Sequence, residues 1–280
     1  MAMSILSHFF PSRPEPITLE RFVELRAAQP RRLCFGTSQK LGRGTNGPAI
    51  GFLNLPFRET IERLLPWNLD RKDGQFGPRR VIRSEAEYGD IERWIGENGE
   101  VVFIRSLLLT CVAAAVHQSS PGHHTVVGEL ERRAKYEADV HASAQLLDRL
   151  EVVYRRLLHC LGIDAVCSVP SSGQERSCLP AWLAAGLSQR LNVEDLSGEV
   201  RWAGAKPSMK EVNVDHKWSA LGAVGLLIQK SVEGRRILII DDLYQSGATV
   251  HYLASQLQAA GASELHCLTV VKSLSDTDNT

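Results

Sequence analysis

The sequence has no hydrophobic run long enough to cross a membrane. Its longest apolar stretch, residues 107–116, follows Arg105 and Ser106 and is much shorter than the roughly 20 residues that a membrane-spanning helix needs. The first ten residues also lack the basic segment followed by an apolar one that a secretory signal peptide requires. We therefore expect a cytoplasmic protein without a membrane partner.

Paired cysteines of the Cys-x-x-Cys type are absent as well. This absence excludes a zinc ribbon and a thioredoxin-like redox site. The cysteines are scattered along the chain, and we expect buried thiols in a reducing compartment. They are Cys34, Cys111, Cys160, Cys167, Cys178 and Cys267.

The chain has no net charge, because 32 basic residues balance 32 acidic ones. Bulk attraction to nucleic acid or to an anionic membrane is thus not expected. The balance is uneven, however: basic residues are twice as numerous as acidic ones up to Ser84, and acidic residues predominate after it. Arg79, Arg80 and Arg83 could meet a polyanion such as nucleic acid, although a solvated surface is the simpler interpretation.

The first 84 residues are rich in glycine and proline, which makes their structure weakly predictable. We expect a helix over residues 18–28 with Thr18 as its N-cap, a strand over 32–35 and a helix over 57–65. Residues 42–47 contain three glycines and predict a flexible loop, which could cover an active site.

From residue 100 onward, apolar strands alternate with amphipathic helices. This alternation predicts an α/β fold with a mostly parallel sheet and helices on both faces, preceded by an N-terminal α+β region. We expect an N-terminal region of unknown role over residues 1–125, either a hood or an accessory domain, and one α/β domain over 126–280. The strands are expected at 101–104, 165–169, 198–202, 236–240 and 266–271, and the helices at 146–161, 179–191 and 248–260.

Residues 236–249 carry the clearest chemical signal. A buried strand is followed by Asp241 and Asp242, and a short loop with Ser246, Gly247 and Thr249 then enters a helix. Such a loop directs main-chain N–H groups, hydroxyls and the positive end of a helix at one point, which suits a phosphate group. The two carboxylates could accept hydrogen bonds from sugar hydroxyls or hold Mg²⁺. Together they suit a sugar phosphate.

This segment resembles the phosphoribosyl-diphosphate (PRPP) loop of the type I phosphoribosyltransferases: an apolar strand, two acidic residues, three variable positions and Ser/Thr-Gly-x-Ser/Thr. The resemblance implies an enzyme in which Asp241 and Asp242 are catalytic, contact the ribose 2′ and 3′ hydroxyls and hold Mg²⁺ directly or through water. An ordinary strand, turn and capped helix is the alternative. The resemblance also implies a 5′-phosphate site formed by Tyr244, Gln245, Ser246, Gly247, Ala248 and Thr249.

Two further segments are similar to diphosphate-binding parts of the same family. Residues 167–176 resemble its diphosphate loop, although a Pro-Ser-Ser-Gly turn is also a common connection between strand and helix. Residues 206–217 are polar and basic and fit a mobile loop that closes over the diphosphate, although a solvated surface loop explains them equally well. The candidates for diphosphate binding are Ser171, Ser172, Gly173, Arg176, Lys206, Lys210 and Lys217.

Within the family, the chain most resembles the competence-type (ComF-like) phosphoribosyltransferases. Residues 128–139 are similar to their Lys-Tyr segment ahead of the first helix, so the resemblance implies that Lys135 reaches the diphosphate; a surface lysine is the alternative. The four-cysteine zinc element of those proteins has no counterpart, since only Cys34 and Cys111 precede residue 126.

The acceptor of the phosphoribosyl group is not identified by the sequence. Gln245 stands where purine-salvage relatives carry an aspartate, and a neutral amide cannot act as a general base, which ranks 6-oxopurine salvage low. PRPP and a small-molecule acceptor are the expected partners, and the sequence leaves open whether the protein forms a homo-oligomer. The alternatives are a PRPP- or nucleotide-sensing module without turnover, and an accessory protein for DNA uptake or nucleic-acid processing. A metal site at His117, His123 and His124 is less expected than a solvated turn.

Overall fold

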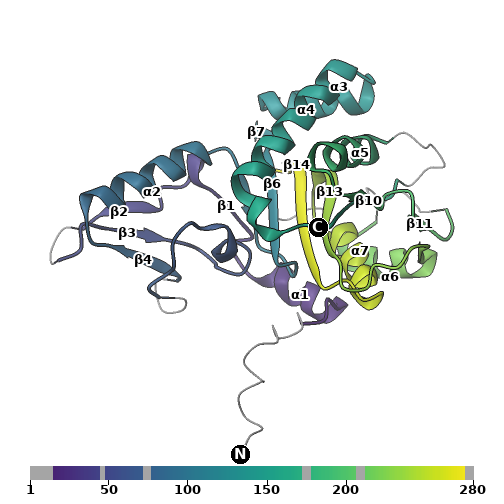
Figure 1. The fold of residues 1–280 in the computed structure, drawn as a ribbon, viewed down its shortest axis with the longest axis horizontal. Coiled ribbons are helices and arrows are strands. Elements are labelled where there is room, and N and C mark those ends of the chain that lie inside the picture. Colours follow the sequence, from purple (N-terminus) through teal and green to yellow (C-terminus); the bar gives the residue numbers. More distant parts are fainter. Residues whose placement is uncertain (1–14, 45–47, 72–76, 172–177, 206–211, 275–280) are drawn as a thin grey trace, which may run out of the picture.

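The computed structural model describes residues 15–44, 48–71, 77–171, 178–205 and 212–274. A seven-stranded sheet lies at the centre of the molecule (Figure 1). Its strands, in spatial order, are β1 (Arg32–Cys34), β5 (Val102–Ile104), β6 (Thr110–Val116), β14 (Glu264–Lys272), β13 (Arg236–Tyr244), β9 (Ala165–Ser168) and β10 (Glu194–Asp195). The strands from β6 to β10 are parallel, whereas β5 runs antiparallel to β6 and β1 antiparallel to β5.

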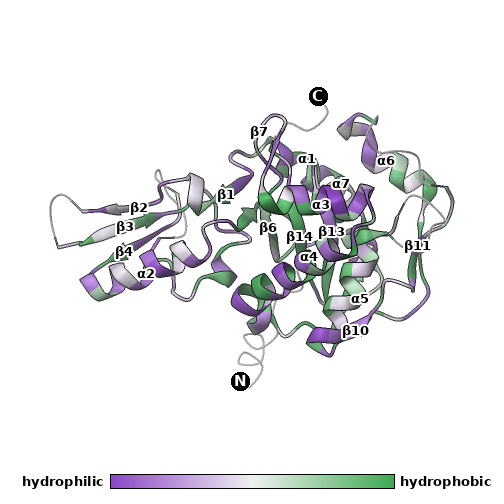
Figure 2. Cartoon of the chain, turned by 90° about the horizontal axis from the view of Figure 1, so that it is seen from above, coloured by the Kyte–Doolittle hydropathy of each residue, from purple (hydrophilic) through white to green (hydrophobic). Residues whose placement is uncertain are grey.

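Helices cover both faces of this sheet. On one face, Leu238 and Ile240 of β13 belong to a core shared with α4 (Val140–Val153) and α5 (Leu179–Leu191). On the other face, Ile237 and Ile239 pack with α7 (Ala248–Ala259). The strands stand out as apolar between more polar helices in Figure 2. Both faces are therefore buried, as the alternating pattern predicts, and the α/β fold is confirmed.

Three further helices complete these layers. α3 (Val126–Tyr136) packs on α4, and α6 (Val214–Val224) packs on α7. α1 (Leu19–Ala27) places Phe22 against Trp218 of α6, with their ring centroids 5.5 Å apart. None of the helices in the described part of the chain is both long and apolar enough to cross a membrane.

An N-terminal lobe extends from the edge of the sheet, at the left of Figure 1. It consists of β2 (Leu41–Arg43), β3 (Gly51–Asn54), β4 (Arg79–Ile82) and α2 (Glu85–Glu97). Edge-to-face contacts of Phe35 with Trp94 and Phe103 join the lobe to β5. The predicted flexible loop at residues 42–47 thus begins within β2, in the lobe, and residues 45–47 lie outside the described part.

The central sheet continues across the predicted domain boundary at residue 126. β6 lies before that boundary, yet it pairs with β14 from Thr110 through Val116. β5 and β1 extend the same sheet further. The apolar run 107–116 thus supplies a central strand, and its side chains from Thr110 to Ala115 are buried because both faces of the sheet are covered.

Most predicted elements are present with similar bounds. Thr18 caps α1, α5 spans the predicted residues, and the helix that starts as α4 continues in irregular turns to Gly162, which has a φ of 61°. Only a short 3₁₀ turn, Glu62–Leu64, replaces the predicted helix at 57–65. The predicted strand at 198–202 is β11 (Val200–Trp202), which pairs with β12 (Leu226–Ile228) in a separate sheet. A small hairpin of β7 (Gln118–Ser120) and β8 (His123–His124) follows β6.

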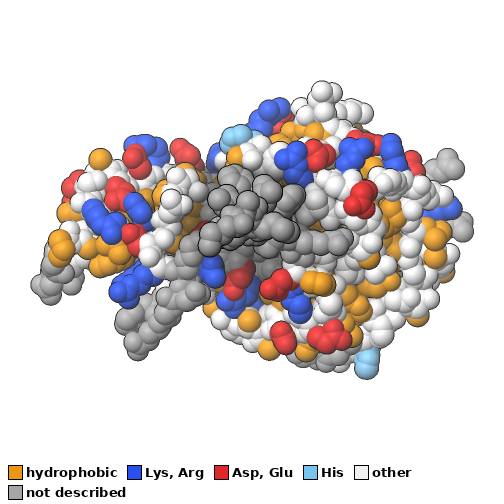
Figure 3. Space-filling model, turned by 60° about the horizontal axis from the view of Figure 1, so that its bottom comes forward, with side chains coloured by type: hydrophobic (Ala, Val, Ile, Leu, Met, Phe, Trp, Pro, Cys, Tyr) orange, Lys and Arg blue, Asp and Glu red, His pale blue; other side chains and the backbone are white. Residues whose placement is uncertain are grey.

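Two of the three candidate arginines in the N-terminal lobe are neutralised by nearby carboxylates, and the third packs over an aromatic ring. Arg80 lies 2.6 Å from Glu87, and Arg83 lies 2.9 Å from Asp70. Arg79 stacks over the ring of Phe52. Figure 3 accordingly shows basic and acidic side chains interspersed on the lobe. These contacts favour the solvated surface over a polyanion site for the three arginines.

Candidate active site

Five parallel strands end at one edge of the central sheet, which we call the carboxyl edge. The loop after β9 begins there with Pro170 and Ser171, and residues 245–247 follow β13. His117 follows β6 and donates its main-chain N–H to the carbonyl of Lys272, the last residue of β14. Ligands of open α/β sheets bind at this kind of edge, so the candidate residues converge where a ligand is expected.

The loop between β13 and α7 depends on Gly247. This residue has a φ of +81° and is the N-cap of α7. A Cβ at this position would collide with the hydroxyl oxygen of Tyr244, whose side chain is buried. Only glycine satisfies both conditions. Because glycine offers no capping side chain, the main-chain N–H groups at the start of α7 are suited to an anion.

The two carboxylates lie within β13, which runs on to Tyr244 instead of ending before them. Asp242 is buried, and its Oδ2 lies 2.6 Å from Nζ of Lys135. Asp241 is half-buried, and its Oδ1 accepts the main-chain N–H of Asp242 at 3.0 Å. Successive residues of a strand point to opposite faces, so the two carboxylates leave β13 in different directions.

Lys135 connects Asp242 to a second, buried carboxylate. Its Nζ lies 3.5 Å from Glu131, one turn earlier on α3, and Glu131 lies 3.5 Å from Nε2 of His117. Burial opposes ionisation of Lys135, but the adjacent Asp242 and Glu131 outweigh it and raise the pKa of the amine. Burial likewise raises the pKa of Glu131, but contacts with His117 and Lys135 more than compensate and lower it. The structure therefore holds a charged lysine at the carboxyl edge.

The predicted diphosphate residues are only partly described. Lys135 is brought to Asp242, although it lies in the last turn of α3 and not ahead of the helix. Ser171 is half-buried after β9. Lys217, expected in a mobile loop, is instead buried within α6, because Trp218 and Leu221 draw this segment into the core. Ser172, Gly173, Arg176, Lys206 and Lys210 lie outside the described residues.

Sequence reasoning missed several residues of this region. Glu131 gives no signal on its own, since it lies among other charges on α3. Lys272 is fully buried at the end of β14, where its Nζ donates to the hydroxyl of Ser273 at 3.0 Å. Its position directly after a predicted apolar strand is a signal that could have found it, because that strand ends at the carboxyl edge.

The donor set fits Mg²⁺ bound together with a substrate. No group of three or more metal-ligating side chains gathers within the described ranges, including around His117, His123 and His124. Asp241 and Asp242 are adjacent on β13, and each offers carboxylate oxygens on its own side of the strand. Mg²⁺ commonly binds through one or two carboxylates and completes its shell with substrate phosphates and water. The residues thus suit a metal brought with the substrate, not an all-protein metal cage.

His251, in the first turn of α7, lies behind the loop. Its Nε2 accepts the main-chain N–H of Leu107 at 3.2 Å and lies 3.0 Å from the hydroxyl of Ser106. Since Nε2 accepts, the proton of the neutral ring is on Nδ1, which donates to the carbonyl of Gly247 at 2.8 Å. Burial lowers the pKa of His251 to about 4, despite the opposing bond to Gly247. The ring is therefore neutral in the folded protein at physiological pH.

We expect His251 to make the protein sensitive to acid. Between pH 6.5 and about 4 the unfolded chain binds a proton that the folded one excludes, so the free energy of unfolding falls as pH falls through this window. The loss should reach about 3 kcal/mol at the acid end. Urea unfolding at pH 7.5 and pH 5 measures the part of this loss above pH 5, about 2 kcal/mol, and His251→Gln is expected to show a smaller decrease than the wild type.

The control for this prediction is His159→Gln, which changes an exposed histidine and leaves the buried imidazole in place. Its pH dependence should match that of the wild type. Burial also lowers the pKa of His266, so part of the acid sensitivity remains in both variants. An unchanged decrease in His251→Gln would contradict the assignment of this effect to His251.

Residues 178–280 match the family model of the phosphoribosyl transferase domain. This range is well under half of the chain and contains Asp241, Asp242 and the whole loop into α7. Over these residues the chain is similar to the phosphoribosyl transferase domain, and the α/β fold is consistent with that class of protein. No curated protein matches the chain.

Solved structures with a related fold cover about half of the chain. The purine phosphoribosyltransferase of Pyrococcus horikoshii is 16% identical over 47% of this chain and 85% of its own, with a TM-score of 0.32. The adenine phosphoribosyltransferase of Thermoanaerobacter pseudethanolicus is 20% identical over 49% and 83%, with a TM-score of 0.32. That of Saccharomyces cerevisiae is 18% identical over 51% and 75%, with a TM-score of 0.34. Similarities this low carry no conclusion about the acceptor.

Proposed function

We propose that the protein transfers the phosphoribosyl group of PRPP to a nitrogenous base or a related acceptor. A bond forms between the acceptor atom and C1 of the ribose, the bond from C1 to the diphosphate oxygen breaks, and the acceptor proton passes to solvent. The observation that carries this proposal is the loop from β13 to α7, where two carboxylates precede an obligatory glycine at an open helix terminus.

Each part of the site has a role in this reaction. The loop 244–249 binds the 5′-phosphate through main-chain N–H groups. Asp241 and Asp242 bind the ribose hydroxyls and stabilise the positive charge that develops on the sugar as the diphosphate departs. Lys135, held charged beside Asp242, lies where it could meet the leaving diphosphate, and its contact with Glu131 keeps it at this edge when it leaves Asp242.

Mg²⁺, when bound, would neutralise charge on the leaving diphosphate. Asp241 and Asp242 would hold it, directly or through water. We further propose that the functional relationship is to the ComF-like enzymes, for which the position of Lys135 next to Asp242 gives support. Gln245 lies half-buried in the loop, and its neutral amide disfavours a 6-oxopurine acceptor.

Diphosphate release from PRPP across a panel of nucleobases and base precursors tests the proposal. We expect release that depends on one class of acceptor and on Mg²⁺, and little release with PRPP alone. Isothermal titration with PRPP and Mg²⁺ accompanies this assay. Binding of PRPP without release in the presence of any acceptor would indicate a sensing module, and absence of PRPP binding would contradict the proposed function.

A further inference from the structure

Two consecutive carbonyl groups of the phosphate loop are held from behind by buried side chains. Nη2 of Arg31 donates to the carbonyl oxygen of Ser246 at 3.0 Å, and the Arg31 side chain is buried. Nδ1 of His251 donates to the carbonyl oxygen of Gly247 at 2.8 Å, and the same carbonyl accepts the main-chain N–H of His251 at 2.9 Å. Arg31 reaches the loop from the segment between α1 and β1, whereas His251 reaches it from the first turn of α7.

The direction of these carbonyls fixes the direction of the N–H groups. In a trans peptide the C=O and the following N–H point in opposite directions. Holding the Ser246 carbonyl on Arg31 therefore turns the N–H of Gly247 away from Arg31. Holding the Gly247 carbonyl on His251 likewise turns the N–H of Ala248 to the opposite side, at the terminus of α7, where its described acceptor is the hydroxyl of Ser246 at a long 3.4 Å.

We propose that Arg31 and His251 are positioning residues for the 5′-phosphate of PRPP. They aim the main-chain N–H groups of Gly247 and Ala248 at the phosphate before it binds, so that the loop does not have to be ordered by the ligand. This inference rests on the proposed function. It assigns to the phosphate site two side chains whose described hydrogen bonds with the loop are to main-chain carbonyls.

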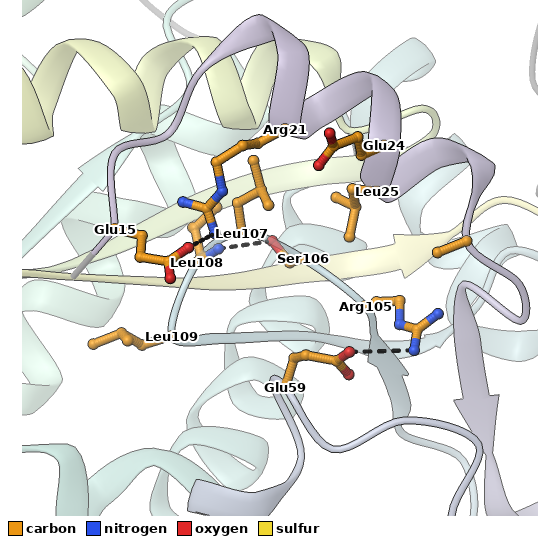
Figure 4. A pocket seen from close by; sticks show the side chains of 11 residues that line it. Glu15, Arg21, Glu24, Leu25, Glu59, Arg105, Ser106, Leu107, Leu108 and Leu109 are labelled. Atoms are coloured by element: carbon orange, nitrogen blue, oxygen red, sulfur yellow. Dashed lines mark hydrogen bonds and ion pairs between the residues drawn. The ribbon is translucent and has the colours of Figure 1, made fainter. Parts of the chain in front are cut away.

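The part of the chain before residue 126 supplies Arg31 and also fixes the ring of His251. Arg31 lies between α1 and β1, and its carbonyl accepts the N–H of Arg105. The ring of His251 is fixed by Ser106 and Leu107 and packs on Phe22 of α1, with centroids 5.0 Å apart. Figure 4 shows Ser106 and Leu107 beneath α1, at a cavity of about 460 Å³. The N-terminal region is thus part of the phosphate site.

The guanidinium of Arg31 should affect binding of the 5′-phosphate of PRPP and not binding of its diphosphate. Replacing it in Arg31→Met frees the Ser246 carbonyl and lets the peptide turn, which should weaken binding of ribose 5-phosphate about tenfold. Binding of inorganic diphosphate should stay unchanged. In steady state, the KM for PRPP should rise by a similar factor with a much smaller decrease in kcat. Isothermal titration with the two probes and a PRPP kinetic series measure these effects.

The matched control is Arg21→Met, which removes another arginine of the same segment. Arg21 pairs with Glu15 at the surface, at 2.6 Å, and makes none of its described contacts with the loop. It should bind both probes like the wild type. Arg31→Lys keeps a cationic donor and should restore part of the ribose 5-phosphate affinity. If Arg31→Met does not fold, the comparison of Arg31→Lys with the wild type is the test.

The outcomes separate this inference from the proposed function. Wild-type affinity of Arg31→Met for ribose 5-phosphate, or equal loss of both probes with no recovery in Arg31→Lys, overturns the positioning role alone. A wild-type protein that binds neither ribose 5-phosphate nor PRPP overturns the proposed function, and the inference with it. Selective loss of ribose 5-phosphate with partial recovery in Arg31→Lys supports it.

Discussion

The double variant Asp241→Asn/Asp242→Asn should lose kcat/KM for PRPP by about a hundredfold or more. Neutral amides cannot stabilise the positive charge that develops on the ribose, and they are poor ligands for Mg²⁺. The fold should survive, because Lys135 keeps its contact with Glu131 when Asp242 is neutralised. Diphosphate release under saturating acceptor measures this loss, and the unfolding midpoint in urea reports the fold.

The matched control is Asp164→Asn, which removes a carboxylate at the opposite end of β13. Asp164 pairs with Arg236, the first residue of the strand, at 2.9 Å. Its loss should lower the free energy of unfolding by about 1 kcal/mol or less, as for an exposed ion pair, and leave kcat/KM unchanged. Near wild-type turnover in the double variant would refute a catalytic role of the acidic pair.

The single variants distinguish the two carboxylates. Asp242→Asn removes the closest partner of Lys135, whereas Asp241→Asn leaves that ion pair intact. Asp242→Asn should therefore alter the response to diphosphate as well as to the sugar. The fixed alternation of side chains along β13 gives the physical reason, since only Asp242 points to the face that α3 covers.

Apolar periodicity and helix-end residues predict those helices whose bounds depend on nearby residues alone. The helices α5 and α7 have apolar periodicity together with Pro180 in a first turn and Gly261 after an end, and both form nearly as expected. The helix α2 is not predicted, because its thirteen residues include many charged side chains and two glycines, although Ser84 caps it. Its stability comes from packing of Tyr88 and Ile91 in the lobe, which no local pattern encodes.

The candidate site likewise contains residues that the sequence predicts and residues that it does not. The acidic pair, Gly247 and Lys135 could be predicted, because they lie in a motif or in a segment similar to one. Arg31 could not, since it meets Ser246 across 215 residues of sequence, and its described bond to the loop ends on a main-chain carbonyl, which leaves no trace in residue type. Because such contacts leave no pattern in the sequence, the sequence does not decide whether residues 1–125 form a hood or an accessory domain.

The variant Gly247→Ala should lose affinity for PRPP by about a hundredfold or more while remaining folded. A methyl group there collides with the hydroxyl of Tyr244, and a φ of +81° adds about 1–2 kcal/mol of strain. The loop can relieve both only by turning its peptides, which moves the N–H groups of Gly247 and Ala248 away from the phosphate. Isothermal titration with PRPP and with ribose 5-phosphate measures the effect.

Gly234→Ala separates backbone strain from the loss of the phosphate site. Gly234 has a similar φ of +70°, but a Cβ there meets no neighbouring atom within 4 Å, and the residue lies in the turn before β13, at the opposite end of that strand from the loop. Both variants should be destabilised in urea, because both place alanine in a left-handed conformation, and Gly247→Ala at least as much as Gly234→Ala, because it also meets Tyr244. Only Gly247→Ala should lose PRPP affinity. Equal affinities in the two variants would show that the phosphate is not bound by this loop, since Gly234 lies at the other end of β13.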